Sequence, residues 1–243
     1  MERIAFITDL HLDEQSVIDK GVDARKNWKH ILNDLTSRNI DQVILGGDLG
    51  EPESHTWLRD SLKDYKFNIL LGNHDQFEEV SKHFDIHSFS HTELYYSHED
   101  DHIKYLFLDS SSASISNDQF LWFENELATD KNVVVFIHHP VLEIETPIDR
   151  IYPLNGREKI NQALQQCKKN VLVFCGHYHM DDERKEGRIT QYVTPAASFQ
   201  ITKNAPAIET DNSFFGYRII SIDKDNVNSE VILYKSGVFV PPI

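Results

Sequence analysis

RIAFITDLHL, residues 3–12, joins a short apolar run to an acid and a histidine. The run RIAFIT (3–8) has the length and composition of a buried strand that opens the fold. Asp9 and His11 are two positions apart, and residues at that spacing on an extended chain face the same side. A carboxylate and an imidazole placed in this way are able to bind one metal ion. A surface loop that contains an acid and a histidine by chance explains this single motif equally well.

The same arrangement recurs after four later apolar runs of strand length. These are QVILG (42–46) before Gly47-Asp48, FNILLG (67–72) before Asn73-His74-Asp75, VVVFI (133–137) before His138-His139, and VLVFC (171–175) before Gly176-His177-Tyr178-His179. Glycine lets a ligand approach the backbone closely, and open α/β sheets place their sites at the C-terminal ends of strands. Gly-Gly-Asp is also an ordinary turn, but a turn does not favour a histidine between Asn73 and Asp75. Taken together, the five strand ends predict one shared site.

Helical patterns alternate with the apolar runs, and this order predicts the fold class. The β-α-β-α-β start indicates a parallel sheet with helical crossovers, and Ser116 begins a capping box, S-x-x-Q, ahead of a later helix. The other predicted helices cover residues 22–38, 54–64 and 156–167, and a hairpin is predicted from residues 93–97 and 102–109.

No linker, repeat or low-complexity segment interrupts the chain, so we predict a single domain over residues 1–243. Its fold class is α/β, a four-layer αββα sandwich of two mixed sheets with helices on the outer faces. The last 55 residues contain three strand-like runs with little helix between them. We expect these runs, at residues 189–194, 216–222 and 229–234, in the second sheet.

Composition limits the classes of partner. The chain has 24 Lys and Arg against 39 Asp and Glu, a net charge of −15, which disfavours binding to nucleic-acid backbones. No apolar run approaches the roughly 18 residues of a membrane span, and the apolar stretch IAFI is too short for a signal peptide. Cys167 and Cys175 form no Cys-x-x-Cys pair, which favours a reducing compartment without disulfides. We therefore expect a cytoplasmic protein without a membrane partner.

The number of candidate ligands indicates two metal ions. The candidates are Asp9, His11, Asp48, Asn73, His138, His177 and His179. Seven ligands are too many for one tetrahedral ion, and they suit two ions that share a bridging carboxylate. A mixture of imidazole, carboxylate and amide ligands suits Mn or Fe, with Zn or Co as alternatives, and does not indicate Ca or Mg alone.

These blocks, in this order, resemble the calcineurin-like metallophosphoesterase superfamily. Its pattern of D-x-H, G-D-x-x-D/E, G-N-H-D/E, H-H-P and G-H-x-H is matched by DLH, GDLGE, GNHD, HHP and GHYH between residues 9 and 179. TPAASFQI (194–201) and FFGYRIISI (214–222) are similar to the tail of the class III cyclic nucleotide phosphodiesterase branch.

The resemblance implies a role for each matching residue. Asp9, His11 and His179 would bind the first metal. The second metal would be bound by Asn73, His138 and His177, and Asp48 would bridge the two. His74 would be the general acid at the leaving oxygen, with Asp75 holding its imidazole in place. His139 would lie near the metal shell without binding.

The activity implied by the resemblance is hydrolysis of a phosphodiester of a small nucleotide-like substrate, with 3′,5′-cyclic AMP as the first candidate. A metal-bridging hydroxide would attack phosphorus while His74 assists the leaving group. Relatives that cleave cyclic nucleotides often carry an arginine shortly after GNHD, where this chain has Gln76-Phe77-Glu78-Glu79. Residues 147–158 lie between the HHP and GHYH blocks, where family members build substrate contacts, and their role is left open.

Two alternatives therefore stay open, a phosphomonoesterase or pyrophosphatase on another small phosphorylated metabolite and a non-catalytic metal-binding scaffold. A scaffold that had lost its activity would show gaps in the motifs, and this chain has none. The oligomeric state is left open, a dimer included.

Overall fold

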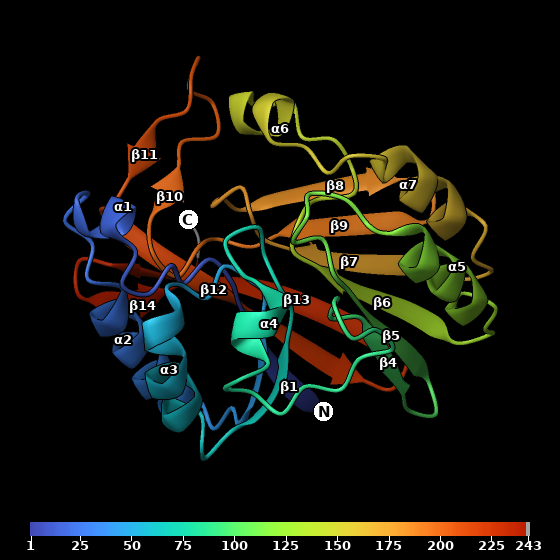
Figure 1. Cartoon of the computed structure of the whole chain (residues 1–243), viewed down its shortest axis with the longest axis horizontal. Helices are drawn as coiled ribbons and strands as arrows, with labels where there is room; N and C mark the ends of the chain where they lie inside the picture. Colours follow the sequence, from blue (N-terminus) through green and yellow to red (C-terminus); the bar gives the residue numbers. More distant parts are fainter. Residues whose placement is uncertain (242–243) are drawn as a thin grey trace.

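The computed structural model describes residues 1–241, and its two six-stranded sheets lie face to face (Figure 1). The first sheet has the strand order β14-β13-β12-β1-β2-β3, and the second has the order β4-β5-β6-β7-β9-β8. A separate pair, β10 and β11, stands at one end of the sheets.

The strand bounds follow the apolar runs closely. The first sheet contains β1 (Glu2–Ile7), β2 (Gln42–Leu45), β3 (Lys66–Ile69), β12 (Phe214–Asp223), β13 (Asn226–Lys235) and β14 (Val238–Val240). The second contains β4 (Tyr96–Glu99), β5 (Ile103–Leu108), β6 (Asn132–Ile137), β7 (Val171–Cys175), β8 (Asp182–Glu186) and β9 (Ile189–Val193). The short pair is β10 (Gln200–Ile201) and β11 (Thr210–Asp211).

The helices cover the outer faces of the two sheets. They are α1 (Gln15–Ile18), α2 (Ala24–Ser37), α3 (His55–Ser61) with the 3₁₀ turn Pro52–Ser54 before it, α4 (Phe77–Val80), α5 (Asn117–Glu126), α6 (Pro147–Ile151) and α7 (Arg157–Gln165). In α2 the Asp23 side chain caps the first turn and Trp28, Ile31 and Leu35 are buried, as the helical stripe predicts. Ser116 caps α5 through the Gln119 N–H, while the Gln119 side chain instead bonds the backbone of Asp109. Among the described residues, no helix combines the length and apolar character needed to cross a bilayer.

Three apolar layers hold the sandwich together. An aromatic layer lies between the sheets, where the Phe6 ring is 5.7 Å from Phe136 and 6.5 Å from Phe174. The other two layers lie between each sheet and its outer helices, and contain Trp28 on one side and Phe123 on the other. The predicted four-layer αββα architecture is therefore confirmed.

The expected placement of the C-terminal strands was wrong for two of the three. β9 lies in the second sheet, but β12 pairs antiparallel with β1, and β13 pairs with β12 in the first sheet. β12 is apolar on both faces, since Ile220 packs between the sheets and Ile219 packs under the outer helices. Such a strand fits a central position in either sheet, and periodicity alone does not say which strand it pairs with.

Parallel pairing brings the carboxyl ends of β1, β2 and β3 to one edge of the first sheet. The loops after β1 and β2 continue side by side, because Leu12 N donates to Leu49 O at 3.1 Å and Glu51 N donates to Leu12 O at 2.9 Å. Gly50 makes this contact possible. Its φ is +120°, and a Cβ atom there would lie 2.2 Å from Leu12 N.

We expect Gly50→Ala to destabilise the protein much more than Gly237→Ala. Both glycines have positive φ, which costs an L-residue about 1–2 kcal/mol, but a Cβ at Gly237 meets nothing within 4 Å. Gly50→Ala adds a clash with the Leu12 backbone, and overpacking costs a further ~1–3 kcal/mol. Urea denaturation of both variants measures the difference. Equal losses would show that the β1 and β2 loops are not held at this contact.

Candidate metal centre

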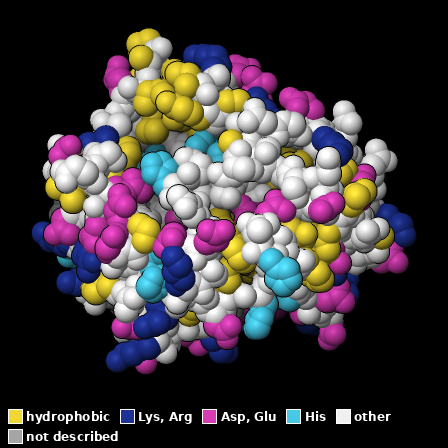
Figure 2. Space-filling model, viewed as in Figure 1, with side chains coloured by type: hydrophobic (Ala, Val, Ile, Leu, Met, Phe, Trp, Pro, Cys, Tyr) yellow, Lys and Arg dark blue, Asp and Glu magenta, His cyan; other side chains and the backbone are white. Residues whose placement is uncertain are grey.

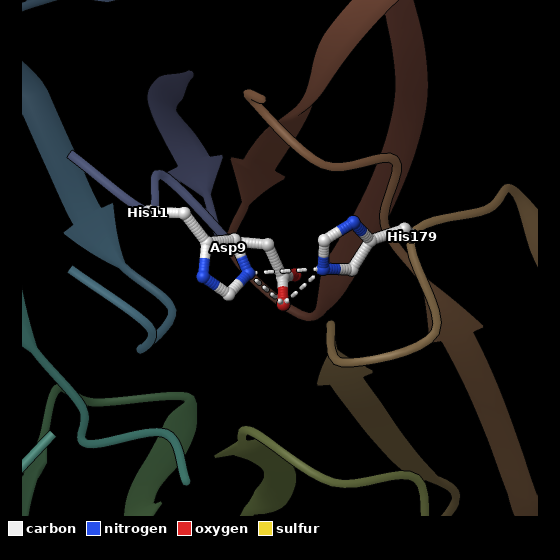
Figure 3. Close-up of side chains that lie close together, drawn as sticks. All are labelled: Asp9, His11 and His179. Carbon is white, nitrogen blue, oxygen red and sulfur yellow. Dashed lines mark hydrogen bonds and ion pairs between the residues drawn. The ribbon is translucent and has the colours of Figure 1, made fainter. Parts of the chain in front are cut away.

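The strand ends that the sequence singled out converge in two clusters of side chains. Asp9, His11 and His179 place their donor atoms within 4.8 Å of one another, and Asp48, His138 and His177 do the same. Figure 3 shows the Asp9 carboxylate pointing between the rings of His11 and His179. Asn73 is exposed and lines the same pocket as Asp48 and His74.

In the first cluster, each histidine already uses its outer ring nitrogen in a hydrogen bond. His11 Nδ1 lies 2.8 Å from Glu14 Oε1, and His179 Nδ1 lies 2.9 Å from the Phe199 carbonyl oxygen. Because both oxygens accept, each Nδ1 donates, and each Nε2 of a neutral ring keeps its lone pair. These two Nε2 atoms are 3.1 Å apart, with Asp9 Oδ1 3.2 Å from His179 Nε2. Two lone pairs and a carboxylate oxygen at such distances repel unless a cation lies among them.

The second cluster is arranged in the same way. His138 Nδ1 lies 2.8 Å from the Gly46 carbonyl oxygen, and His177 Nε2 lies 3.0 Å from the Tyr152 carbonyl oxygen. The opposite nitrogen of each ring is therefore left as a ligand, the usual pattern for metal-binding histidines. His138 Nε2 is fully buried and has no hydrogen-bond partner among the described residues. An orphaned nitrogen beside buried carboxylates fits a metal ion.

Asp48 lies between the two clusters. Its Oδ2 is 3.3 Å from His138 Nε2 in one cluster and 3.6 Å from His11 Nε2 in the other. Its Oδ1 accepts the His74 backbone N–H at 2.9 Å. One oxygen is thus fixed by the backbone, while the other faces both groups of imidazoles.

The pKa values show that the buried carboxylates and the histidines around them favour each other's charged forms. Burial alone would raise the pKa of Asp9 and Asp48, but the surrounding histidines hold both well below their usual range. For His138, burial acts to lower the pKa, yet the Asp48 and Asp9 carboxylates raise it to about 10. Burial and the neighbouring His138 lower the pKa of His177 to about 4.

Backbone strain is concentrated at the same residues. Five of the seven candidate ligands have a left-handed backbone, a conformation that costs a non-glycine residue of order 1–3 kcal/mol. Their φ values are +56° for Asp9, +48° for His11, +53° for Asp48, +67° for His177 and +48° for His179. Strain of this kind persists where the surrounding fold enforces it, and it clusters at functional sites.

Comparison with known proteins agrees with this site. A sequence model of the calcineurin-like phosphoesterase superfamily domain matches residues 2–206. The chain belongs to the calcineurin-like phosphoesterase superfamily. The resemblance inferred from the five motifs is confirmed, and the chain is a metal-dependent phosphoesterase.

Two relatives of this phosphoesterase are named as probable phosphodiesterases. The chain is 28% identical over 237 residues to a probable cyclic nucleotide phosphodiesterase of Fibrobacter succinogenes, covering 94% of this chain and 93% of that protein. It is also 28% identical over 176 residues to a probable glycerophosphodiester phosphodiesterase of Arcobacter nitrofigilis, covering 66% and 64%. Its fold is similar to that of a dimetal phosphatase from Danio rerio, with a TM-score of 0.67 at 9% identity over 96% of this chain and 95% of that one.

The expected pairing of Asp75 with His74 in this phosphoesterase was wrong. The Asp75 carboxylate accepts the backbone N–H groups of Asp48, Leu49 and Gly72 at 2.8–2.9 Å, so it ties the β2 and β3 loops together. Glu14 is the carboxylate beside the imidazole, with Oε2 3.2 Å from His74 Nδ1. The hydrogen bond to Glu14 raises the pKa of His74 to about 9. Burial acts in the opposite direction but has a smaller effect.

Sequence reasoning missed Glu14 and did not align residues 147–158. Glu14 lies on the turn after His11, where no strand or helix periodicity marks it. In the 147–158 segment, Asp149 accepts hydrogen bonds from the Tyr178 hydroxyl and from Arg157 Nη1, both at 2.5 Å. The segment therefore anchors the loop that carries His177 and His179.

His139 is placed beside the metal clusters, as the family pattern implies. Its Nδ1 lies 2.9 Å from the Ser110 hydroxyl, and its ring centroid is 4.0 Å from that of His177. Burial and the neighbouring His177 and His138 hold the pKa of His139 far below its usual range, so the ring is neutral. Its neutral ring packs against His177 and supports that ligand.

Asp48→Ala should lose at least one of two bound metals, because Asp48 Oδ2 lies 3.3 Å from His138 Nε2 in one cluster and 3.6 Å from His11 Nε2 in the other, whereas Asp9 Oδ1 is 3.9 Å from His138 Nε2. Elemental analysis of the purified protein measures the metal content. Asp109→Ala is the matched control, since Asp109 is also a buried carboxylate just after a strand but bonds only backbone and loop groups. Two full equivalents of metal in Asp48→Ala would contradict the bridging assignment.

Proposed function

We propose that this chain is a two-metal phosphodiesterase that hydrolyses a small nucleotide-like phosphodiester, with a 3′,5′-cyclic nucleotide such as cyclic AMP as the first candidate. The observation that carries the proposal is the position of Asp48 Oδ2 between two histidine clusters, 3.3 Å from His138 Nε2 and 3.6 Å from His11 Nε2. A carboxylate shared by two ligand groups suits the paired ions of phosphoryl-transfer sites.

The ligands divide as the family pattern implies. Asp9, His11 and His179 would hold one ion, Asn73, His138 and His177 would hold the other, and Asp48 would be shared between them. Imidazole nitrogens with carboxylate and amide oxygens suit Mn or Fe first, with Zn or Co as alternatives. When bound, two such ions acidify a shared water and clamp the phosphoryl group for in-line attack.

The chain itself supplies the proton for the leaving group. His74 Nδ1 faces Glu14, so Nε2 is the nitrogen left to face the pocket, and 45% of the side chain is exposed there. The Glu14 contact favours the protonated imidazole, since it raises the pKa of His74 to about 9. His74 therefore donates a proton to the departing oxygen, while Asp75 acts by fixing the loop.

The relatives and the motifs favour a diesterase over the other readings. The cyclic nucleotide relative matches along nearly its whole length, whereas the glycerophosphodiester relative matches over about two thirds. A monoesterase or pyrophosphatase is the second candidate. A non-catalytic scaffold is the third candidate, and it does not account for the raised pKa of His74.

Two further proposals concern the whole chain. The C-terminal strands complete the first sheet, so we take residues 1–243 as one phosphoesterase domain. The buried free thiols of Cys167 and Cys175 support a cytoplasmic location.

His74→Ala should keep both metals and lower kcat for cyclic AMP by about 10²–10⁴, the usual contribution of general acid–base catalysis. The loss on bis(4-nitrophenyl) phosphate should be much smaller, because a nitrophenolate leaves without protonation. Steady-state kinetics of the Mn-loaded protein on both substrates gives the comparison.

His91→Ala, at an exposed histidine of the loop before β4, serves as the control and should change neither rate. Equal losses of His74→Ala on the two substrates would mean that His74 positions the phosphate and does not donate a proton. No hydrolysis of either diester by the wild type would overturn the proposed activity.

A further inference from the structure

The pocket over the metal ligands has two chemically different sides. Its volume is about 430 Å³, and its floor is made by histidines, Asp48 and Asn73. Its other side comes from α1, α6 and the β10–β11 hairpin, and it is mainly apolar. The apolar residues there are Val17, Ile148, Tyr152, Phe199, Ile201 and Ile208, and the polar ones are Ser16, Lys20 and Thr210. Figure 2 shows histidine side chains in a recess beneath a cluster of hydrophobic side chains, in the region where Figure 1 places α6 and the hairpin.

Three of the apolar residues are associated with one core cluster. Ile201 and Ile208, both half-buried, pack against the core cluster that contains Ile148 of α6. The hairpin and α6, which are 50 residues apart in sequence, therefore meet at the pocket. We call Ile148, Ile201 and Ile208 the isoleucine wall.

The wall is fixed relative to the metal ligands. Ile201 N donates to the His179 carbonyl oxygen at 2.8 Å, and the Phe199 carbonyl accepts from His179 Nδ1 at 2.9 Å. On the other side, Asp149 holds the Tyr178 hydroxyl at 2.5 Å. A phosphate held at the floor therefore has this apolar surface beside it.

The chemistry of the wall selects the kind of substituent. A flat nucleobase buries its faces on isoleucine side chains with little loss of hydration, at about 25 cal/mol per Å² of apolar surface. A glycerol or ethanolamine group is polar, and the isoleucine side chains offer it no hydrogen bond in exchange for those it makes with water. Lys20 is the one side chain with a permanent positive charge among the described residues that line the pocket, so a second phosphate would find little neutralising charge.

We infer that the isoleucine wall is a nucleobase subsite, and that it makes this phosphoesterase select nucleotide diesters over glycerophosphodiesters. The inference rests on the proposed phosphodiesterase function, because it names the group attached to the phosphate. It adds three specificity-determining residues that lie outside the five metal-binding motifs.

Ile208→Asn tests the subsite by kinetics. The side chain keeps its approximate size but becomes polar, so KM for cyclic AMP should rise about tenfold, equivalent to 1.4 kcal/mol of binding energy. KM for glycerophosphoethanolamine, which has no base, should stay within about twofold. Ile18→Asn is the control, since Ile18 is 52% exposed on α1 and does not line the pocket. Ile208→Ala is the second variant should Ile208→Asn fail to fold.

Adenosine binding to metal-free protein tests the same subsite without catalysis. Calorimetry should show that adenosine binds the wild type and that Ile208→Asn weakens this binding about tenfold. Failure of the wild type to hydrolyse any diester would overturn the proposed function, but the adenosine measurement would still decide the subsite. The inference is overturned if adenosine does not bind or binds both proteins equally, or if KM for the two diesters rises equally.

Discussion

The burial of two carboxylates among imidazoles is the constraint on which this site depends. Asp9 and Asp48 are 0% and 2% exposed at the carboxyl ends of β1 and β2. Backbone N–H groups of His177 and His74 satisfy part of each carboxylate. The remaining oxygens face the inner imidazole nitrogens, because each ring donates its other N–H to Glu14 or to a backbone carbonyl. Burying charge in this way is costly unless it is paired, so the arrangement is complete only with cations in it.

The fold meets this constraint by bringing strand ends together and enforcing an unfavourable backbone there. Parallel pairing within each sheet sets the strand ends at one edge, and the aromatic layer around Phe6 and Phe136 fixes the sheets against each other. Glycines let the loops approach the carboxylates, since a Cβ at Gly72 would lie 2.2 Å from Asp48 Oδ1 and one at Gly176 would lie 2.5 Å from Asp9 Oδ2. The left-handed backbone of five ligands is held by this close packing.

The strands, the outer helices and the seven candidate ligands were predictable because they leave local signals: apolar runs of strand length, helical stripes, and polar residues placed just after them. What the sequence did not reveal depends on three-dimensional approach. The Glu14 carboxylate reaches His11 and His74 from a turn without periodicity, and Asp75 turns toward backbone N–H groups of two loops. The pairing of β12 with β1 also depends on distant parts of the chain, because a strand with Ile219 and Ile220 on opposite faces fits either sheet. The use of residues 147–158 as an anchor for Tyr178 also has no signature along the chain.

The most direct test of this account is a calorimetric titration of metal-stripped protein with Mn²⁺, combined with thermal unfolding. If two cations complete a preformed site, the titration should saturate at two equivalents per chain. The midpoint of unfolding should then rise with free Mn²⁺, because a ligand that binds only the folded state stabilises it. Saturation at one equivalent, or binding that leaves the unfolding midpoint unchanged, would contradict the claim that the buried carboxylates and inward-facing imidazoles form a two-metal centre.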